Sequence, residues 1–278
     1  MKDTIRRALK EDIGKGDITT ICLVPSAMRA KAVIIAKEDG VVAGVDISKL
    51  VFSSLNRKVS FVKHKKDGQK ITKGDIIASL SGPAAPILSG ERVALNFLQR
   101  LSGIATLTDK FAKLCAGTGA KILDTRKTTP NLRRIEKFAV KMGGGVNHRM
   151  GLYDAVLIKD NHLVAEPDIK KAVTKARKTG KSVEIEVKNF SELKSALKAM
   201  PDRILLDNMS AEKLKKAVKT AKTFSKRSGK KIFLEASGGI NLTNVKRIAK
   251  SGVDLISVGA LTHSPKALDI SLEIIKCR

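Results

Sequence analysis

The second half of the chain alternates between short apolar runs and amphipathic segments. After residue 120, apolar runs of strand length predict β-strands, and segments with a 3.6-residue apolar period predict the helices between them. The predicted strands are Lys121–Arg126, Ala155–Lys159, Val183–Val187, Arg203–Asp207, Ile232–Ala236 and Asp254–Gly259, and the predicted helices are 130–142, 167–179, 191–200, 210–227 and 241–251. These βα units are too few for a full barrel of about eight units, so we expect a reduced barrel or an open parallel sheet.

The first half has a different, mixed pattern. It predicts a helix at 3–12, a hairpin at 30–45, a helix at 46–55, and a strand, turn and second strand at 58–81. From Ser89 to Cys115 the apolar period is 3.6, which predicts a long helix that is capped by Ser89 and bridges the two halves. The last residues, 265–278, are expected to be helical or extended and to pack back on this mixed α/β layer.

The charge of the chain is strongly positive. It has 54 Lys and Arg against 27 Asp and Glu in 278 residues, a formal net charge of +27. Nucleic acid, an anionic membrane or a polyanionic small molecule are therefore plausible partners. Aromatic residues make up only 3% of the chain. Because single-strand binding relies on aromatic stacking, nucleic-acid binding is the weaker interpretation.

The cysteines and the N-terminus indicate the cellular compartment of the protein. Cys22, Cys115 and Cys277 are odd in number and lack the spacing of a metal site, which favours a reducing environment. Residues 1–14 are charged throughout, without the apolar core of a signal peptide, and no apolar run approaches membrane-spanning length. We therefore expect a cytoplasmic protein.

Charged and polar residues follow the predicted strands at their downstream ends. They are Asp124, Arg126 and Lys127; Lys159, Asp160 and Asn161; Glu186 and Lys188; Asp207 and Asn208; Glu235 and Ser237; and Gly259. An unpaired charge is costly inside a strand, but the carboxyl ends of parallel strands share one rim. We therefore expect these groups to converge on a ligand.

The cations of this set indicate the kind of ligand. They are Arg126, Lys127, His148, Arg149 and Lys159, and three glycines, Gly143–Gly145, precede the histidine. Arginine suits bidentate contacts with carboxylate or phosphate. The pattern predicts an anion-binding site.

Two glycine-containing turns and two carboxylates add to this prediction. The turns Glu235–Asn241 and Val258–His263 each follow a predicted strand, where backbone N–H groups can bind phosphate. Glu186 and Asp207 end consecutive strands and would suit Mg²⁺ or ribose hydroxyls, although a salt bridge to a nearby lysine explains either one equally well. No zinc-type cluster and no nucleophile–base pair is evident, which favours electrostatic over covalent catalysis.

These motifs resemble a known family. DTRKTTP, GGGVNHRMGLYDAVLIKDNH, ILLDN, LEASGGI and SVGALTHS are similar to those of the quinolinate phosphoribosyltransferases, and the similarity continues through EDIGKGDITT, GVVAG and GERVALNFLQRLSGIAT. The resemblance implies an α/β protein with an incomplete parallel α/β barrel at 111–265. It also implies an N-terminal α/β sandwich at 1–110, joined by 266–278. A homodimer is implied as well, sometimes assembled further, in which an arginine of one subunit completes the site of the other.

The resemblance also implies roles for single residues. Arg92 resembles the cross-subunit arginine, Arg126, His148 and Arg149 resemble the quinolinate carboxylate clamp, and Lys127 and Lys159 resemble the contacts to phosphoribosyl pyrophosphate. Glu186 and Asp207 resemble the carboxylates that hold ribose and Mg²⁺. Ser237, Gly238, Gly239, Val258, Gly259 and Ala260 resemble a 5′-phosphate cradle, and Thr125 and His263 are similar to further substrate contacts.

The implied reaction joins quinolinate to phosphoribosyl pyrophosphate and gives nicotinate mononucleotide, pyrophosphate and carbon dioxide, a step of NAD biosynthesis. Three alternatives remain open. The first is a phosphoribosyltransferase of the same fold that uses another aromatic acid, and the second is a basic nucleic-acid-binding protein. The third is a biotinyl or lipoyl carrier, suggested by residues 67–82 but weakened because no lysine stands at a tight hairpin tip.

Overall fold

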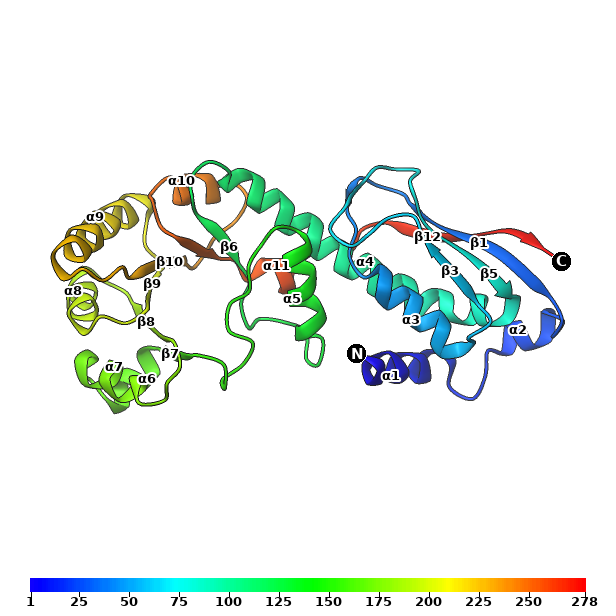
Figure 1. Cartoon of the computed structure of the whole chain (residues 1–278), viewed down its shortest axis with the longest axis horizontal. Helices are drawn as coiled ribbons and strands as arrows, with labels where there is room; N and C mark the ends of the chain where they lie inside the picture. The colour runs from blue at the N-terminus through cyan, green and yellow to red at the C-terminus, as the bar shows by residue number, and fades with distance from the viewer. The chain divides into compact units, whose positions relative to one another are not determined.

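The computed structural model describes residues 1–278 and divides into two compact units. One unit comprises Met1–Asp109, Thr129–Gly144 and Ser264–Arg278, and the other comprises Lys110–Thr128 and Gly145–His263. The long helix α4 (Ala84–Cys115) runs through the boundary at residue 109 (Figure 1). No helix of the chain combines the length and the apolar character needed to cross a bilayer.

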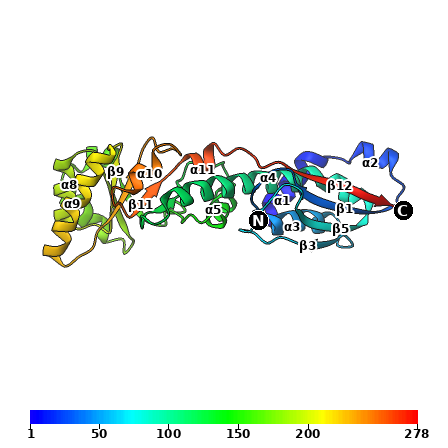
Figure 2. The same ribbon diagram turned by 90° about the horizontal axis from the view of Figure 1, so that it is seen from above.

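The first unit is built on an antiparallel sheet in the order β12-β1-β5-β3. Its elements are α1 (Lys2–Ile13), α2 (Ile18–Leu23), β1 (Arg29–Ala36), β2 (Gly40–Val41), α3 (Val45–Leu55), β3 (Ser60–Lys63), β4 (Lys70–Ile71), β5 (Ile76–Pro83), α4, α5 (Arg133–Met142) and β12 (Ile270–Cys277). The tail is extended, as one of the two predicted forms, and β12 pairs along β1 (Figure 2).

Two expectations for this unit were wrong. Residues 30–45 do not form a hairpin, because β12 and β5 occupy both edges of β1, so β2 pairs with β4 instead. The long helix begins at Ala84 rather than at Ser89. Pro86 falls in its first turn, where the missing N–H of a proline costs no helical hydrogen bond.

Helix α5 belongs with the first unit, whereas the sequence placed residues 111–265 together in the second domain. Glu136 on α5 is fully buried and its Oε1 lies 2.7 Å from Arg100 Nη2 on α4. A Cβ at Gly143 would come within 2.2 Å of the Ala105 carbonyl oxygen, so only glycine permits the close approach of this segment to α4.

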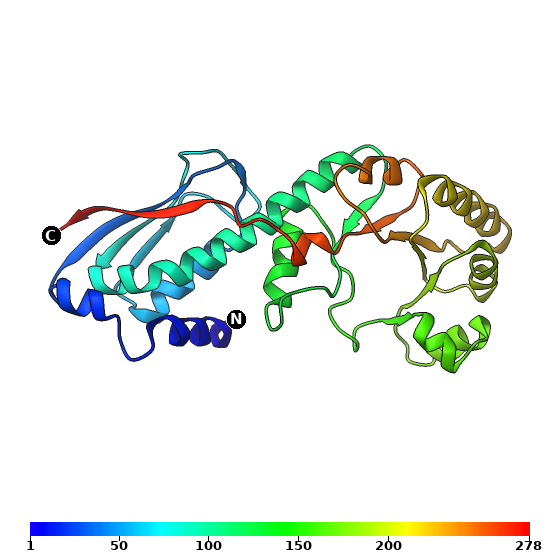
Figure 3. The same ribbon diagram turned by 180° about the vertical axis from the view of Figure 1, so that it is seen from behind.

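The second unit is a six-stranded parallel sheet in the order β6-β11-β10-β9-β8-β7. Its elements are β6 (Lys121–Leu123), β7 (Val156–Ile158), α6 (Asp160–Ala165), α7 (Ile169–Arg177), β8 (Val183–Val187), α8 (Phe190–Ala199), β9 (Arg203–Asp207), α9 (Ala211–Ser228), β10 (Phe233–Ser237), α10 (Val245–Ala249), β11 (Leu255–Ser257) and α11 (Ala260–His263). Helices α7, α8, α9 and α10 line the outer side of a curved row of strands (Figure 3).

This sheet does not close, because β6 and β7 are its two edges and pair with different neighbours. Beside β6, a single bridge from Leu123 to Val146 is all that continues the sheet toward β7. The prediction of an incomplete parallel barrel is therefore confirmed. The strands β6 and β7 are shorter than predicted, so Arg126 and Lys127 lie on a loop rather than at a strand end.

Candidate functional site

A cavity of about 780 Å³ lies at the carboxyl ends of the strands of the second unit. It is lined by every predicted site residue of that unit, namely Thr125, Arg126, Lys127, His148, Arg149, Lys159, Glu186, Asp207, Ser237, Gly238, Gly239, Val258, Gly259, Ala260 and His263. The convergence expected from the strand ends is therefore present for these residues. Asp124 and Lys188, which were expected to converge as well, do not line the cavity: Asp124 is buried and Lys188 pairs with Asp160. Among the predicted site residues, Arg92 is the exception: it is exposed on α4 in the first unit and does not line this cavity.

The loop after β6 is anchored from both sides. Asp124 is fully buried, and its Oδ1 accepts a hydrogen bond of 2.9 Å from the His148 backbone N–H. Thr262 Oγ1 donates to the Lys127 carbonyl oxygen at 2.8 Å. These contacts hold the backbone of the loop while Arg126 and Lys127 remain exposed at the cavity.

The arginines of the cavity lie close enough to affect one another. Burial lowers the pKa of the Arg149 guanidinium, and repulsion from Arg126 lowers it further, whereas Glu184 acts in the opposite direction. Arg149 Nη1 also donates to the Ala155 carbonyl oxygen at 2.9 Å. Two neighbouring cations fixed in this way repel one another until an anion is bound between them.

Lys159 follows β7 and lies close to the carboxylate of Glu186, near the end of β8. Its Nζ lies 3.5 Å from Glu186 Oε2, and its side chain is 48% exposed. Such a half-exposed pair contributes little to stability. The lysine is therefore free to exchange this carboxylate for a substrate anion at small cost.

The turn after β10 requires glycine. Gly238 has φ +96°, and a Cβ there would come within 2.1 Å of Asn208 Oδ1. The Asn208 backbone N–H donates to the Ser237 carbonyl oxygen at 2.9 Å, which joins this turn to the end of β9. The sequence was wrong that a helix opens directly from this turn, because α10 begins only at Val245. The second turn does lead into a helix, α11, at Ala260.

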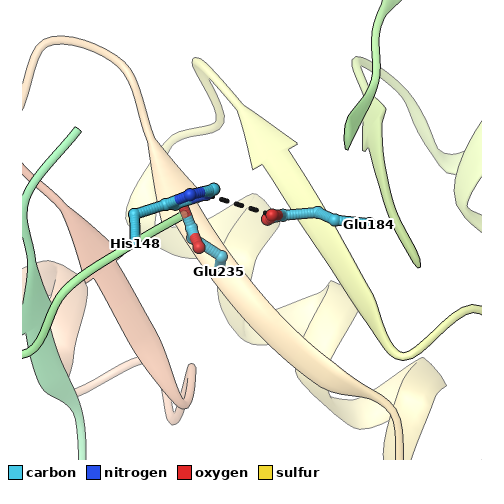
Figure 4. Close-up of side chains that lie close together, drawn as sticks. All are labelled: His148, Glu184 and Glu235. Atoms are coloured by element: carbon cyan, nitrogen blue, oxygen red, sulfur yellow. Dashed lines mark ion pairs between the residues drawn. The ribbon is translucent and has the colours of Figure 1, made fainter. Parts of the chain in front are cut away.

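Beneath the cavity lies a buried acidic network that the sequence did not predict (Figure 4). His148 Nε2 is 3.0 Å from Glu184 Oε2 and 3.7 Å from Glu235 Oε1. Arg203 Nη1 is 2.9 Å from Glu235 Oε2. Glu235 was noted only as a strand-end residue, and Glu184 and Arg203 were missed. The alternation in Val183–Val187 offered a signal, since Glu184 and Glu186 must point to the same face.

Burial shapes the protonation of this network. It raises the pKa of Glu184, and it raises the pKa of Glu235 to about 7, helped by the negative charge of Glu184. His148 and Arg203 act against the shift of Glu235. Two carboxylates this close titrate as a pair, so near neutral pH the pair tends to keep one proton.

Two groups of side chains have donors suited to a cation. Glu186 and Asp207 both line the open cavity at the ends of adjacent strands, which fits Mg²⁺ because this ion takes one or two carboxylates together with substrate phosphates. The ligand atoms of His148, Glu184 and Glu235 also lie within 4.8 Å of one another. The Arg203 guanidinium already supplies positive charge there, which disfavours a second cation.

Comparison with known proteins agrees with this arrangement. The chain matches the family description "Quinolinate phosphoribosyl transferase, N-terminal domain" over residues 17–102 and the C-terminal domain of the same family over residues 104–273. A Bacillus subtilis protein named probable nicotinate-nucleotide pyrophosphorylase (carboxylating) is 44% identical over 277 residues, covering 99% of this chain and 93% of that protein.

Solved structures agree in the fold. Nicotinate-nucleotide pyrophosphorylase from Francisella tularensis has a TM-score of 0.91 at 42% identity, covering 98% of this chain and 95% of that one. The protein of the same name from Ehrlichia chaffeensis has a TM-score of 0.91 at 41% identity, covering 99% and 98%. The resemblance of the sequence motifs is thus confirmed, and the chain belongs to the quinolinate phosphoribosyltransferase family.

Proposed function

We propose that this protein transfers the phosphoribosyl group of phosphoribosyl pyrophosphate to the ring nitrogen of quinolinate, with loss of one carboxyl group as carbon dioxide. The products are nicotinate mononucleotide and pyrophosphate, as the names of the relatives imply for those proteins. The observation that carries the proposal is the gathering of Arg126, Lys127, Arg149 and Lys159 around one cavity. Both substrates are polyanions, and they approach one another only where fixed cations offset their repulsion.

The carboxylates of quinolinate are assigned to the side of the cavity that holds Arg126 and Arg149, with His148 beside them. Burial lowers the pKa of Arg149 and repulsion from Arg126 lowers it further, and a dicarboxylate that lies between the two guanidiniums relieves this repulsion. A monoacid leaves part of that repulsion in place. This is the physical reason to prefer a dicarboxylate over nicotinate as the acceptor.

The phosphoribosyl donor is assigned to the lysines of the cavity and to the two glycine-containing turns. Lys127 and Lys159 bind its phosphates, and the turns at Ser237–Gly239 and Val258–Ala260 offer backbone N–H groups to the 5′-phosphate. The absence of a Cβ at Gly238 keeps this backbone open to a ligand. Thr125 and His263 line the same cavity and complete the donor side.

Glu186 and Asp207 are assigned to the ribose and to Mg²⁺. A bound Mg²⁺ would neutralise the departing pyrophosphate. The two carboxylates also face the ribose carbon, which becomes cationic as its bond to pyrophosphate breaks, and their negative charge stabilises it. After the new C–N bond forms, the carboxyl group next to the ring nitrogen leaves as carbon dioxide, and Lys127, Lys159 or the arginines stabilise the negative charge that develops at that carbon. The carbon then takes a proton from water, which gives nicotinate mononucleotide.

A homodimer is part of the proposal. Arg92 is exposed on α4 and is assigned to the cavity of a partner subunit. Mixing Arg92→Ala protein with Arg126→Ala protein tests this, since each variant alone should be nearly inactive. Exchanged subunits would form dimers with one intact site, and activity should reappear on mixing. Mixtures that stay inactive although the subunits exchange would contradict the assignment.

The identity of the acceptor is tested by pyrophosphate release from phosphoribosyl pyrophosphate. Quinolinate should support rapid release, and nicotinate and other aromatic monoacids should support little. A stronger response to another aromatic acid would favour the same-fold alternative. No release with any acid would contradict phosphoribosyl transfer altogether.

A further inference from the structure

The segment between Val146 and β7 carries two cavity residues, His148 and Arg149, but contains no strand. Val146 makes the single bridge to Leu123. The backbone N–H groups of His148, Arg149 and Met150 donate to the side-chain atoms Asp124 Oδ1, His148 Nδ1 and Asp154 Oδ2. The position of this segment therefore depends on side chains rather than on a sheet ladder.

The His148 ring uses both of its nitrogens inside the protein. Nδ1 accepts the Arg149 backbone N–H at 2.7 Å, so Nδ1 carries no proton in this arrangement. The proton of a neutral ring then sits on Nε2, which points at Glu184 Oε2 at 3.0 Å (Figure 4). One tautomer of the ring thus satisfies both contacts, and the other tautomer satisfies neither.

The carboxylate that accepts this hydrogen bond, Glu184 on β8, belongs to a network that includes side chains of β9 and β10. Glu184 on β8 pairs in register with Arg203 on β9, whose Nη1 lies 3.8 Å from Glu184 Oε2 and 2.9 Å from Glu235 Oε2 on β10. Glu184 is 5% exposed and Glu235 is fully buried. The His148 segment is thereby tied to the middle of the parallel sheet.

Burying the carboxyl groups of Glu184 and Glu235 lowers the stability of the fold. Apart from contact between the two carboxyl groups themselves, Glu184 Oε1 and Glu235 Oε1 are buried and have no hydrogen-bond partner. Buried carboxylate oxygens without partners destabilise a fold, and apolar residues would serve stability better. A cost of this kind directly beneath a ligand cavity points to a role in the site.

We infer that Glu184, Glu235 and Arg203 are positioning residues that hold the His148 ring in its Nε2–H tautomer and thereby fix Arg149 at the quinolinate end of the cavity. The inference rests on the proposed function for its kinetic consequence, and on geometry alone for the state of the ring. It predicts that changes in the network weaken the binding of quinolinate and leave the binding of phosphoribosyl pyrophosphate unchanged. Quinolinate binding depends on Arg149, whereas the donor binds to lysines and turns on other strands.

The kinetic test uses Glu184→Gln and Glu235→Gln, with Glu212→Gln on the exposed first turn of α9 as the matched control. Loss of the outer partner of a metal-binding histidine costs about 10- to 100-fold, and by analogy we expect the KM for quinolinate to rise by about tenfold or more. The KM for phosphoribosyl pyrophosphate should stay near that of the control in both variants, and the thermal midpoint should not fall far below that of the control at pH 7. Arg203→Lys should retain more of the quinolinate affinity than Arg203→Met.

The ring state is tested by ¹H–¹⁵N correlation of the histidine side chains. The chain has four histidines, and a His148→Gln variant assigns the signal of interest. We expect the Nε2–H form in the wild-type protein and a mixture of tautomers in Glu184→Gln. If Glu184 had only a structural role, its replacement by glutamine would leave the His148 signal unchanged.

Two results would overturn the inference. One is a His148 signal that is the same in wild-type protein and in both glutamine variants. The other is an equal rise in both KM values together with a lower melting temperature, which would mark general loosening. Should the wild-type protein release no pyrophosphate with quinolinate, the proposed function fails, and the spectroscopic result still decides the role of the network in holding the ring.

Discussion

Single residues of this site act through charges that are held close together in one cavity. Burial lowers the pKa of Arg149, Arg126 stands near enough to lower it further, and Arg149 is held by its hydrogen bond to the Ala155 carbonyl oxygen. Fixed charges of this kind need no reorganisation when a charged substrate reacts, which is the main source of electrostatic catalysis. The catalytic value of each cation can therefore be measured by removing it.

Replacing Arg126 with alanine should lower kcat/KM for quinolinate by at least about 100-fold, the effect associated with one preorganised electrostatic group. Lys222→Ala, an exposed lysine of α9, removes the same charge outside the cavity and should have no comparable effect. Steady-state kinetics at fixed salt checks both. Near-normal kinetics for Arg126→Ala would argue against the carboxylate clamp.

Glu235 should make stability depend on pH in an unusual direction. Its pKa rises from 4.5 to about 7 on folding, so between these values the folded state binds more protons than the unfolded state. The contribution of this protonation to the free energy of unfolding is fully present below pH 4.5. It is lost as pH rises through about 7, and the total loss is on the order of 3 kcal/mol.

Glu235→Gln removes this titration. Thermal midpoints of the wild-type protein and the variant, measured from pH 5 to pH 8, should diverge, with the wild-type protein losing relative stability as pH rises. A difference that is constant across this range would show that the carboxyl of Glu235 does not titrate there.

At the scale of elements, the ends of strands and the turns after them build the site. The turn after β10 is the sharpest case, since Gly238 combines φ +96° with a 2.1 Å approach of its missing Cβ to Asn208. An alanine there must displace the Asn208 side chain as well as adopt a strained backbone.

Gly238→Ala should therefore weaken binding of phosphoribosyl pyrophosphate by about tenfold or more, because phosphate binding needs this backbone in place. Gly180→Ala is the matched control: it has φ +68° but no atom within 4 Å of the added Cβ, and it is not among the cavity residues. It should cost about 1 kcal/mol of stability without changing the KM. Equal KM values in the two variants would contradict the phosphate cradle.

Elements also explain what the sequence could and could not predict. The apolar periodicity correctly predicted the alternation of strands and helices. The polar residues after the strands correctly predicted the position of the cavity, because parallel strands bring their carboxyl ends together. The false hairpin at 30–45 was unavoidable, since the competing partner of β1 is β12 at the other end of the chain. Likewise, Glu184 and Arg203 meet only through strand register, which a single sequence does not display.

Over the whole molecule, the net charge of +27 exceeds what one cavity needs. A positive field attracts anionic substrates from a distance, and salt screens it with a Debye length of about 10 Å at 0.1 M. We expect the KM of both substrates to rise with ionic strength, and kcat to change less because buried contacts are screened less. Measuring activity at increasing potassium chloride concentration checks this. KM values that do not change with salt would show that charge outside the cavity does not contribute to substrate binding.

The central claim is that one group of cations holds two mutually repelling anions close enough to react. Release of labelled carbon dioxide from quinolinate, measured with and without phosphoribosyl pyrophosphate and Mg²⁺, tests it most directly. The account predicts release only when both substrates are present, with Mg²⁺ required for full rate. Release that does not need the phosphoribosyl donor, or no release with both substrates present, would contradict it.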